Sequence, residues 1–267
     1  MLPFLKWAGG KRWLAGEIQR WVPAKYNLYL EPFLGGGACF FHLEPQRAVL
    51  SDTNSDLIET YRAIQVDPSA VRSALKRHKT AHSDGYYYEM RSRCPSDSVE
   101  RAARFLYLNR TCWNGLYRVN LKGEFNVPRG TKDLILLPDE DFKDVARALA
   151  KAEVQCCDFA QTLARAQRGD LVYVDPPYTV KHNYNGFIKY NQSIFSWDDQ
   201  VRLRDACFDA RVRGATVIIS NADHMSVREL YREADLAESV SRASVIAGKS
   251  AARQRTTELL AVLRGLE

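Results

Sequence analysis

Four consecutive residues, Asp175-Pro176-Pro177-Tyr178, directly follow the apolar run Leu171–Val174. An apolar run ending in such a turn is typical of a buried strand, and open α/β sheets bind ligands beyond the carboxyl ends of their strands. Two successive prolines make the backbone stiff, so the Pro176 carbonyl keeps one direction. That carbonyl and the Asp175 carboxylate can accept the protons of a ring-conjugated amino group such as that of adenine, while Tyr178 stacks on the ring. For the motif alone, a structural turn capped by the aspartate is an equal alternative.

A glycine-rich turn, residues 31–38 with the sequence EPFLGGGA, follows the first apolar run of the chain. Such a turn lets a ligand approach the backbone. Asp52 follows the next apolar run, where a carboxylate can accept hydrogen bonds from ribose hydroxyls, as in dinucleotide-binding folds. Lys11, at the start of a predicted helix, can meet a ligand carboxylate. By itself the turn lacks GxGxxG and is more often structural.

Apolar runs that end in acidic or glycine-rich turns alternate with helical periodicity along the chain. This alternation predicts an α/β fold with a parallel sheet covered by helices on both faces. The predicted strands cover residues 28–30, 48–50, 154–157, 171–174 and 216–220. Residues 240–246 and 257–263 are predicted to pair as an antiparallel end of the sheet, and Ser196 with Asp199 predicts a capping box.

The alternation lapses between Asp52 and Val154, where basic and aromatic side chains are interleaved. We predict a catalytic domain formed by residues 1–55 and 152–267, with an inserted, mostly helical domain at residues 56–151. The formal net charge of +6 and the pI near 9.0 favour a polyanionic partner.

Residues 6–11 read KWAGGK and residues 52–54 read DTN. Together with the glycine-rich turn and the DPPY motif, they resemble the DNA adenine methyltransferase family, the alpha-ordered class of amino-methyltransferases, in content and in order. The resemblance extends from Lys6 to about Leu263. It implies a Rossmann-like methyltransferase sheet with an inserted target recognition domain, and methyl transfer from S-adenosylmethionine to the 6-amino group of an adenine flipped out of duplex DNA. Such direct transfer needs neither a covalent intermediate nor a metal.

The resemblance also implies roles for individual residues. The implied catalytic residues are Asp175, Pro176, Pro177 and Tyr178, with Phe187 or Tyr190 as helpers in stacking the base. The implied cofactor-binding residues are Trp7, Ala8, Lys11, Phe33, Gly35, Asp52, Asp158, Phe159 and Asp175. For Trp7 and Phe33 the alternative is packing in the core.

The family carries a stretch similar to NRTCWNGLYR at residues 109–118 and GEFNVP at residues 123–128, whose hairpin, at about residues 110–130 here, enters the major groove. Gly115 and Gly123 suit the turns of a hairpin. Arg118 suits a bidentate contact with guanine, and Leu116 or Pro128 a thymine methyl group. The implied DNA-binding residues are Lys6, Arg110, Trp113, Asn114, Leu116, Arg118 and Pro128. The alternative is a solvated hairpin with a buried Trp113.

Three departures leave the target sequence open. Family members that recognise GATC usually carry Tyr at position 113, a small residue at 117 and an aromatic-bearing turn at residues 129–132. This chain has Trp113, Tyr117 and the turn RGTK instead. The oligomeric state and any partner nuclease are also open. Two other functions remain: methylation of RNA or a protein amide, whose motifs usually begin with Asn, and DNA binding without catalysis.

The remaining features exclude other classes of protein. The six cysteines form no CxxC pair, so we expect reduced, mostly buried thiols and no zinc site. No apolar run approaches a membrane span, and no signal peptide is recognised. We therefore expect a cytosolic protein that acts on DNA, without a membrane or a metal.

Overall fold

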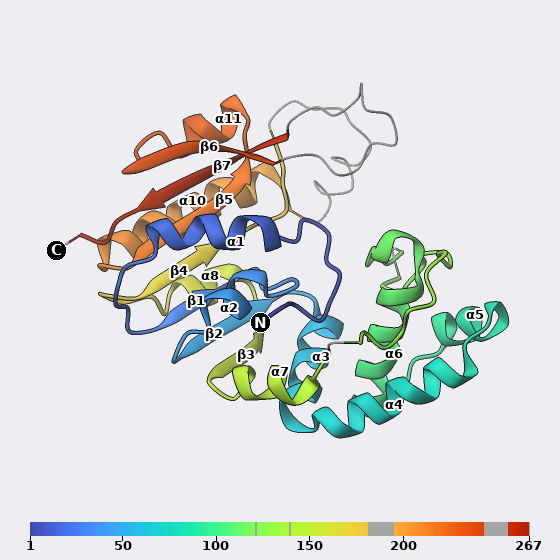
Figure 1. Cartoon of the computed structure of the whole chain (residues 1–267). Helices are drawn as coiled ribbons and strands as arrows, with labels where there is room; N and C mark the ends of the chain where they lie inside the picture. The colour runs from blue at the N-terminus through green and yellow to red at the C-terminus, as the bar shows by residue number, and fades with distance from the viewer. Residues whose placement is uncertain (121, 139, 181–194, 243–255, 267) are drawn as a thin grey trace. The chain divides into compact units, whose positions relative to one another are not determined.

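The computed structural model describes residues 1–120, 122–138, 140–180, 195–242 and 256–266, coloured in Figure 1. Phe187, Tyr190 and part of the strand predicted at 240–246 lie outside the described residues. The chain forms two compact units. The first comprises Met1–Arg12, Leu34–Gln46 and Leu50–Cys156, and the second comprises Trp13–Phe33, Arg47–Val49 and the described part of Cys157–Glu267.

Seven strands, among the described residues, form one mixed sheet in the order β3-β2-β1-β4-β5-β7-β6. Strands β1 and β5 each pair with β4 in parallel, and β7 pairs antiparallel with both β5 and β6. The predicted α/β class and the five predicted strands are thus confirmed. The antiparallel pairing is confirmed for the described residues, although its first strand begins at Leu236 instead of residue 240. The strands are β1 (Tyr29–Glu31), β2 (Ala48–Asp52), β3 (Ala152–Cys156), β4 (Leu171–Val174), β5 (Thr216–Ala222), β6 (Leu236–Arg242) and β7 (Thr256–Leu263).

Strand β4 is buried along its whole length, because every one of its residues is at most 2% exposed. A parallel strand with neighbours on both edges and cover on both faces must be apolar throughout, which explains the uninterrupted run Leu171–Val174. Asp175 is the first residue beyond this run.

The helices of the second unit surround this part of the sheet. Figure 1 shows α10 alongside β5, and α10 also contacts α8. The predicted capping box is confirmed, since Ser196 Oγ accepts the Asp199 N–H at 3.1 Å and Asp199 Oδ2 accepts the Ser196 N–H at 2.9 Å. The helices are α1 (Arg12–Ile18), η1 (Gln19–Trp21), α8 (Phe159–Leu163), α10 (Trp197–Val212) and α11 (Met225–Leu230).

The first unit is mostly helical, and α3 and α4 both pack on α6. Asn54, Asp67, Ser83 and Asp97 each accept a backbone N–H at the start of a helix, which explains where these helices begin. The helices are α2 (Ala38–Leu43), α3 (Ser55–Val66), α4 (Pro68–Ala81), α5 (Asp84–Ser92), α6 (Ser98–Thr111), η2 (Trp113–Gly115) and α7 (Phe142–Leu149).

The cysteines are only partly as expected. None of the six forms a disulfide, and Cys39, Cys112 and Cys207 are buried, but Cys94 and Cys156 are exposed. The expectation of buried thiols is therefore wrong for these two positions.

Arg110, at the end of α6, is a structural residue of the first unit. Its side chain is 2% exposed and forms an ion pair with Glu140, whose side chain is 4% exposed. The guanidinium also donates to the carbonyls of Ile135, at 2.6 Å, and Phe4, at 3.0 Å. Because these donors point into the protein, Arg110 does not present them to DNA, and its prediction as a DNA-binding residue is corrected to a structural role.

Glu140→Ala is expected to lower the free energy of unfolding by about 3–5 kcal/mol, because it leaves a buried guanidinium without its counter-charge. The control is Glu17→Ala, which removes an exposed pair with Arg20 and should cost about 0–1 kcal/mol. Urea unfolding of the two variants provides the comparison. Equal losses would show that burial does not set the strength of the Arg110 pair.

Candidate functional site

The glycine-rich turn and Asp52 form one hydrogen-bonded loop pair in the first unit. The Gly35 N–H donates to Asp52 Oδ2 at 3.0 Å, and the Asn54 N–H donates to Asp52 Oδ1 at 3.0 Å. Gly35 has a φ of 46°, in the left-handed region that glycine tolerates best. Burial raises the pKa of Asp52, and these backbone donors oppose the rise. Each carboxylate oxygen keeps acceptor capacity for a hydroxyl group.

The indole of Trp7 lies against this loop. A Cβ atom built on Gly35 would come within 2.6 Å of Trp7 Cδ1, so no side chain fits there without moving the indole. Ala8 is exposed, whereas Lys11 is buried and donates to the Gly9 carbonyl at 2.8 Å. The structure thus brings Trp7, Gly35 and Asp52 together.

Three aromatic side chains gather in the second unit. Phe33 stacks on Phe159 with ring centroids 5.5 Å apart, and Phe195 meets Phe33 edge-on at 5.6 Å. Asp158 is already engaged, because it caps α8 and pairs through both oxygens with Arg202, each at 3.0 Å. Phe159 and Phe195 are buried in the hydrophobic core of this unit, and the half-buried Phe33 packs against them, which supports the alternative of core packing for Phe33.

The DPPY motif directly follows the carboxyl end of β4, and polar side chains contact the hydroxyl of its tyrosine. The Tyr178 hydroxyl lies 3.2 Å from Ser220 Oγ, which donates to Glu258 Oε2 at 3.5 Å. Burial raises the pKa of Tyr178 well above its ordinary value, and the carboxylates of Asp175 and Glu258 raise it further. The phenol therefore keeps its proton near neutral pH.

Two buried amides support the second proline of the motif. Gln200 Nε2 donates to the Pro177 carbonyl at 3.4 Å, and Asn221 Nδ2 donates to Gln200 Oε1 at 3.0 Å. Both side chains are at most 1% exposed, so each needs its partner. Sequence reasoning missed both residues. The available signal was Gln200, a polar residue three positions before Leu203 on the apolar face of α10.

The predicted hairpin is present in the first unit. Asn126 N–H donates to the Arg118 carbonyl at 3.2 Å, and the segments bridge at Val119 and Phe125. Gly115 and Gly123 both have positive φ, at 67° and 79°. These glycines therefore do supply the turns that the sequence predicts.

Most of the predicted DNA-binding side chains of this hairpin are accessible. Trp113 is 52% exposed, which contradicts the alternative of a buried tryptophan. Arg118 is exposed and donates through Nε to Asn126 Oδ1 at 2.9 Å. Asn114 and Pro128 are exposed, while Leu116 and Lys6 are half-buried.

Lys6 lies in a basic environment. Burial lowers its pKa, and the cations Lys132, Arg110 and Arg12 lower it further. Its backbone N–H donates to Asn109 Oδ1 at 3.1 Å, so residues 6–11 and the start of the hairpin are joined. Of these cations, Arg12 and Lys132 are exposed, so an anion near Lys6 would lie near two further positive charges.

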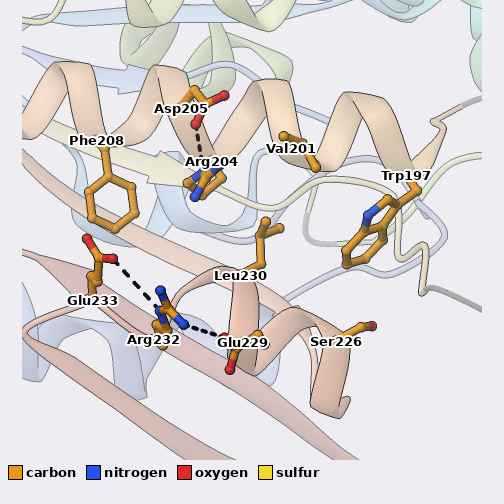
Figure 2. Close-up of a pocket in the computed structure, with 10 residues that line it drawn as sticks. All are labelled: Trp197, Val201, Arg204, Asp205, Phe208, Ser226, Glu229, Leu230, Arg232 and Glu233. Carbon is orange, nitrogen blue, oxygen red and sulfur yellow. Dashed lines mark hydrogen bonds and ion pairs between the residues drawn. The ribbon is translucent and has the colours of Figure 1, made fainter.

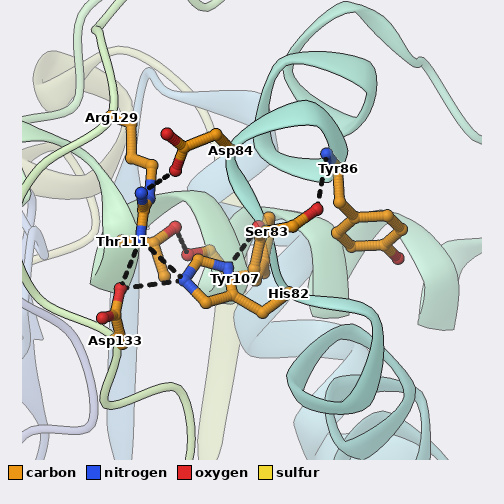
Figure 3. A network of polar contacts seen from close by, with 8 residues as sticks. All are labelled: His82, Ser83, Asp84, Tyr86, Tyr107, Thr111, Arg129 and Asp133. Carbon is orange, nitrogen blue, oxygen red and sulfur yellow. Dashed lines mark hydrogen bonds and ion pairs between the residues drawn. The ribbon is translucent and has the colours of Figure 1, made fainter.

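A polar network holds the segment after the hairpin, residues 129–133 (Figure 3). Arg129 pairs with Asp84 and with Asp133, the latter at 2.8 Å. His82 lies 2.9 Å from Asp133 Oδ1 and, on its other nitrogen, 2.8 Å from the Tyr107 hydroxyl. Arg129 is thus used to attach this turn to the helices.

A hollow on the second unit, between α10 and α11, contains none of the predicted site residues (Figure 2). Its apolar lining includes Trp197 and Leu230, and its charges pair with one another, Arg204 with Asp205 and Arg232 with Glu229, both at 2.7 Å. We assign it no role.

Comparison with known proteins identifies the class to which the fold and the site belong. Residues 7–245 match the family described as D12 class N6 adenine-specific DNA methyltransferase. The chain belongs to this family.

Curated relatives agree over nearly the whole length. The chain is 39% identical to the type II methyltransferase M1.LlaDCHI of Lactococcus lactis subsp. cremoris, over 97% of this chain and 94% of that one. It is 37% identical to a DNA adenine methylase of Vibrio cholerae, over 97% and 95%. It is 35% identical to the DNA adenine methylase of Escherichia coli K12, over 98% and 95%.

These relationships confirm the predicted family and the predicted activity: the chain is a DNA adenine N6-methyltransferase. Within the described residues, no helix is long and apolar enough to cross a membrane. In that same part of the chain, no group of three or more His, Cys, Asp or Glu side chains is placed to hold a metal ion.

Gly35→Ala is expected to destabilise the protein by about 1–2 kcal/mol through its left-handed backbone alone, with a further loss from displacing Trp7. The control is Gly16→Ala in α1, where a Cβ would meet nothing within 4 Å and alanine favours the helix. Urea unfolding measures both. A stable Gly35→Ala variant would contradict the tight packing of the loop on Trp7.

Proposed function

We propose that the chain uses S-adenosylmethionine to methylate an adenine flipped out of duplex DNA, with the DPPY motif as the catalytic segment. The observation that carries this proposal is the placement of the motif directly beyond the buried strand β4, with Tyr178 and Pro177 supported by polar partners from other elements. Rigid support suits a segment whose carbonyl and carboxylate must hold one nitrogen in place.

The residues of the motif have distinct proposed tasks. The lone pair of the adenine amino nitrogen is shared with the ring, so the nitrogen attacks well only when its protons are held and it becomes pyramidal. The Asp175 carboxylate and the Pro176 carbonyl accept those two hydrogen bonds. Tyr178 stacks on the base, which contributes about 1–3 kcal/mol and offsets much of the few kcal/mol that flipping costs.

The residues proposed to hold the cofactor fit its chemistry. Asp52 offers acceptors for ribose hydroxyls, Trp7 and Phe33 are half-buried aromatic side chains, and Lys11 offers a cation for a carboxylate. Phe159 lies behind Phe33 in this proposed set. Gly35 leaves room at the backbone only because it lacks a Cβ. When bound, S-adenosylmethionine supplies the methyl group from its sulfonium. Ala8, Asp158 and Asp175 complete the proposed set.

The hairpin is proposed to select the DNA sequence. Trp113, Asn114, Leu116, Arg118 and Pro128 carry this role, with Lys6 near a phosphate or a base. The division into a catalytic domain and an inserted recognition domain at 56–151 also belongs to the proposal, as does action in the cytosol. The exposure of Trp113 and Arg118 supports the proposed contact of the hairpin with DNA.

Asp175→Asn is expected to reduce methyl transfer by about ten-fold to a few hundred-fold, because one charged hydrogen bond of about 1.5–3 kcal/mol is weakened, and Asp175→Ala should reduce it more. Labelled methyl transfer to unmethylated DNA measures the rate. Sequencing that detects methylated adenine maps the target. The control, Asp205→Asn, alters a carboxylate that pairs with Arg204 outside the site. A folded Asp175→Ala enzyme with unchanged activity would refute the assignment.

Arg118→Ala is expected to relax the preference at one base position by about 1–3 kcal/mol while leaving the other positions intact. Methylation of a randomised-site library by the two enzymes shows the preference at each position. Arg147→Ala, which removes an exposed arginine from α7, is the control. Identical site preferences for Arg118→Ala and the parent enzyme would exclude Arg118 from base recognition.

A further inference from the structure

Tyr117 belongs to the hairpin but turns away from the exposed side chains next to it. Arg118 is exposed, whereas Tyr117 is half-buried. Its ring stacks on Trp7 with centroids 5.7 Å apart and an angle of 24° between the planes. The rings of Phe105, at 5.3 Å, and Phe125, at 5.8 Å, pack against Tyr117 at tilted angles. One side chain of the hairpin therefore contacts the KWAGGK segment directly.

The hydroxyl of Tyr117 makes a second contact with the region proposed to bind the cofactor. It donates to Asp56 Oδ2 at 2.9 Å, and Asp56 lies in the first turn of α3, four residues after Asp52. Burial raises the pKa of Tyr117, and the Asp56 carboxylate raises it further, so the phenol keeps its proton and remains a donor. The Arg101 guanidinium lies 3.6 Å from Asp56.

The ring and the hydroxyl of Tyr117 contact two different parts of the region proposed to bind the cofactor. Trp7 packs against Gly35, and Gly35 donates its N–H to Asp52. The Tyr117 ring thus contacts the residue that covers the glycine-rich turn, and its hydroxyl contacts the helix that follows Asp52. Any displacement of the hairpin at Tyr117 must disturb Trp7, Asp56 or both.

We propose that Tyr117 is a positioning residue that couples the binding of DNA at the hairpin to the binding of S-adenosylmethionine at Trp7, Gly35 and Asp52. This inference rests on the proposed function of both segments. When DNA fixes the hairpin, Tyr117 also fixes Trp7 over the glycine-rich turn. The cofactor then has less of the protein to order when it binds, so it binds more tightly. Because coupling between two binding sites is reciprocal, the cofactor tightens DNA binding by the same factor.

The coupling is measured by titration calorimetry with S-adenosylhomocysteine, which cannot transfer a methyl group. The dissociation constant is determined with and without a saturating duplex carrying the target mapped for the parent enzyme. DNA is expected to tighten binding to the parent. Tyr117→Leu should shrink this factor by about three-fold to ten-fold, the value of an aromatic stack. Tyr117→Phe keeps the stack and loses the Asp56 bond, so it should show a smaller reduction.

Tyr88→Leu is the matched control, because Tyr88 is 45% exposed on α5 and contacts Tyr87 and Arg91 instead. It should keep the full coupling factor. If Tyr117→Leu does not fold, Tyr117→Phe carries the test, and an unchanged factor in that variant overturns the inference. So does a parent enzyme whose affinity for S-adenosylhomocysteine ignores DNA. A parent that does not bind this probe at all contradicts the proposed cofactor site itself.

Discussion

Strand β4 determines where Asp175 and Pro176 lie, because it is paired in parallel on both edges and buried along its whole length. A strand held in this way cannot shift its register without exposing apolar side chains. Asp175 directly follows the strand, and the two prolines after it keep the backbone stiff. The strand and the prolines thus fix the carboxylate and the carbonyl that are proposed to hold the adenine amino group. The catalytic proposal depends on that rigidity.

Buried polar groups around the DPPY motif also stabilise its backbone. Gln200 and Asn221 satisfy one another and the Pro177 carbonyl, while Ser220 holds the Tyr178 hydroxyl. Replacing one such group leaves a buried partner unsatisfied, which costs about 1–3 kcal/mol. These hydrogen bonds therefore stabilise the observed arrangement of the turn, which suits an enzyme that must hold a nitrogen in one geometry.

Local patterns in the sequence were sufficient to predict the strands, the capping box at Ser196 and the hairpin glycines, because each depends on neighbours in the chain. Long-range partners were not predictable. Arg110 was assigned to DNA because nothing near it in sequence shows that Glu140 neutralises it in the interior. Tyr117 was noted only as a departure from relatives, since its stacking on Trp7 joins residues far apart in the chain. The roles of the cofactor and DNA residues remain predictions.

A crystal structure of the enzyme soaked with S-adenosylhomocysteine tests most directly whether the DPPY motif is the catalytic segment. We expect the sulfur of this product to lie in van der Waals contact with the segment Asp175 to Tyr178. Density for the ligand at any other place, with the DPPY segment untouched, would contradict the proposed role of this segment.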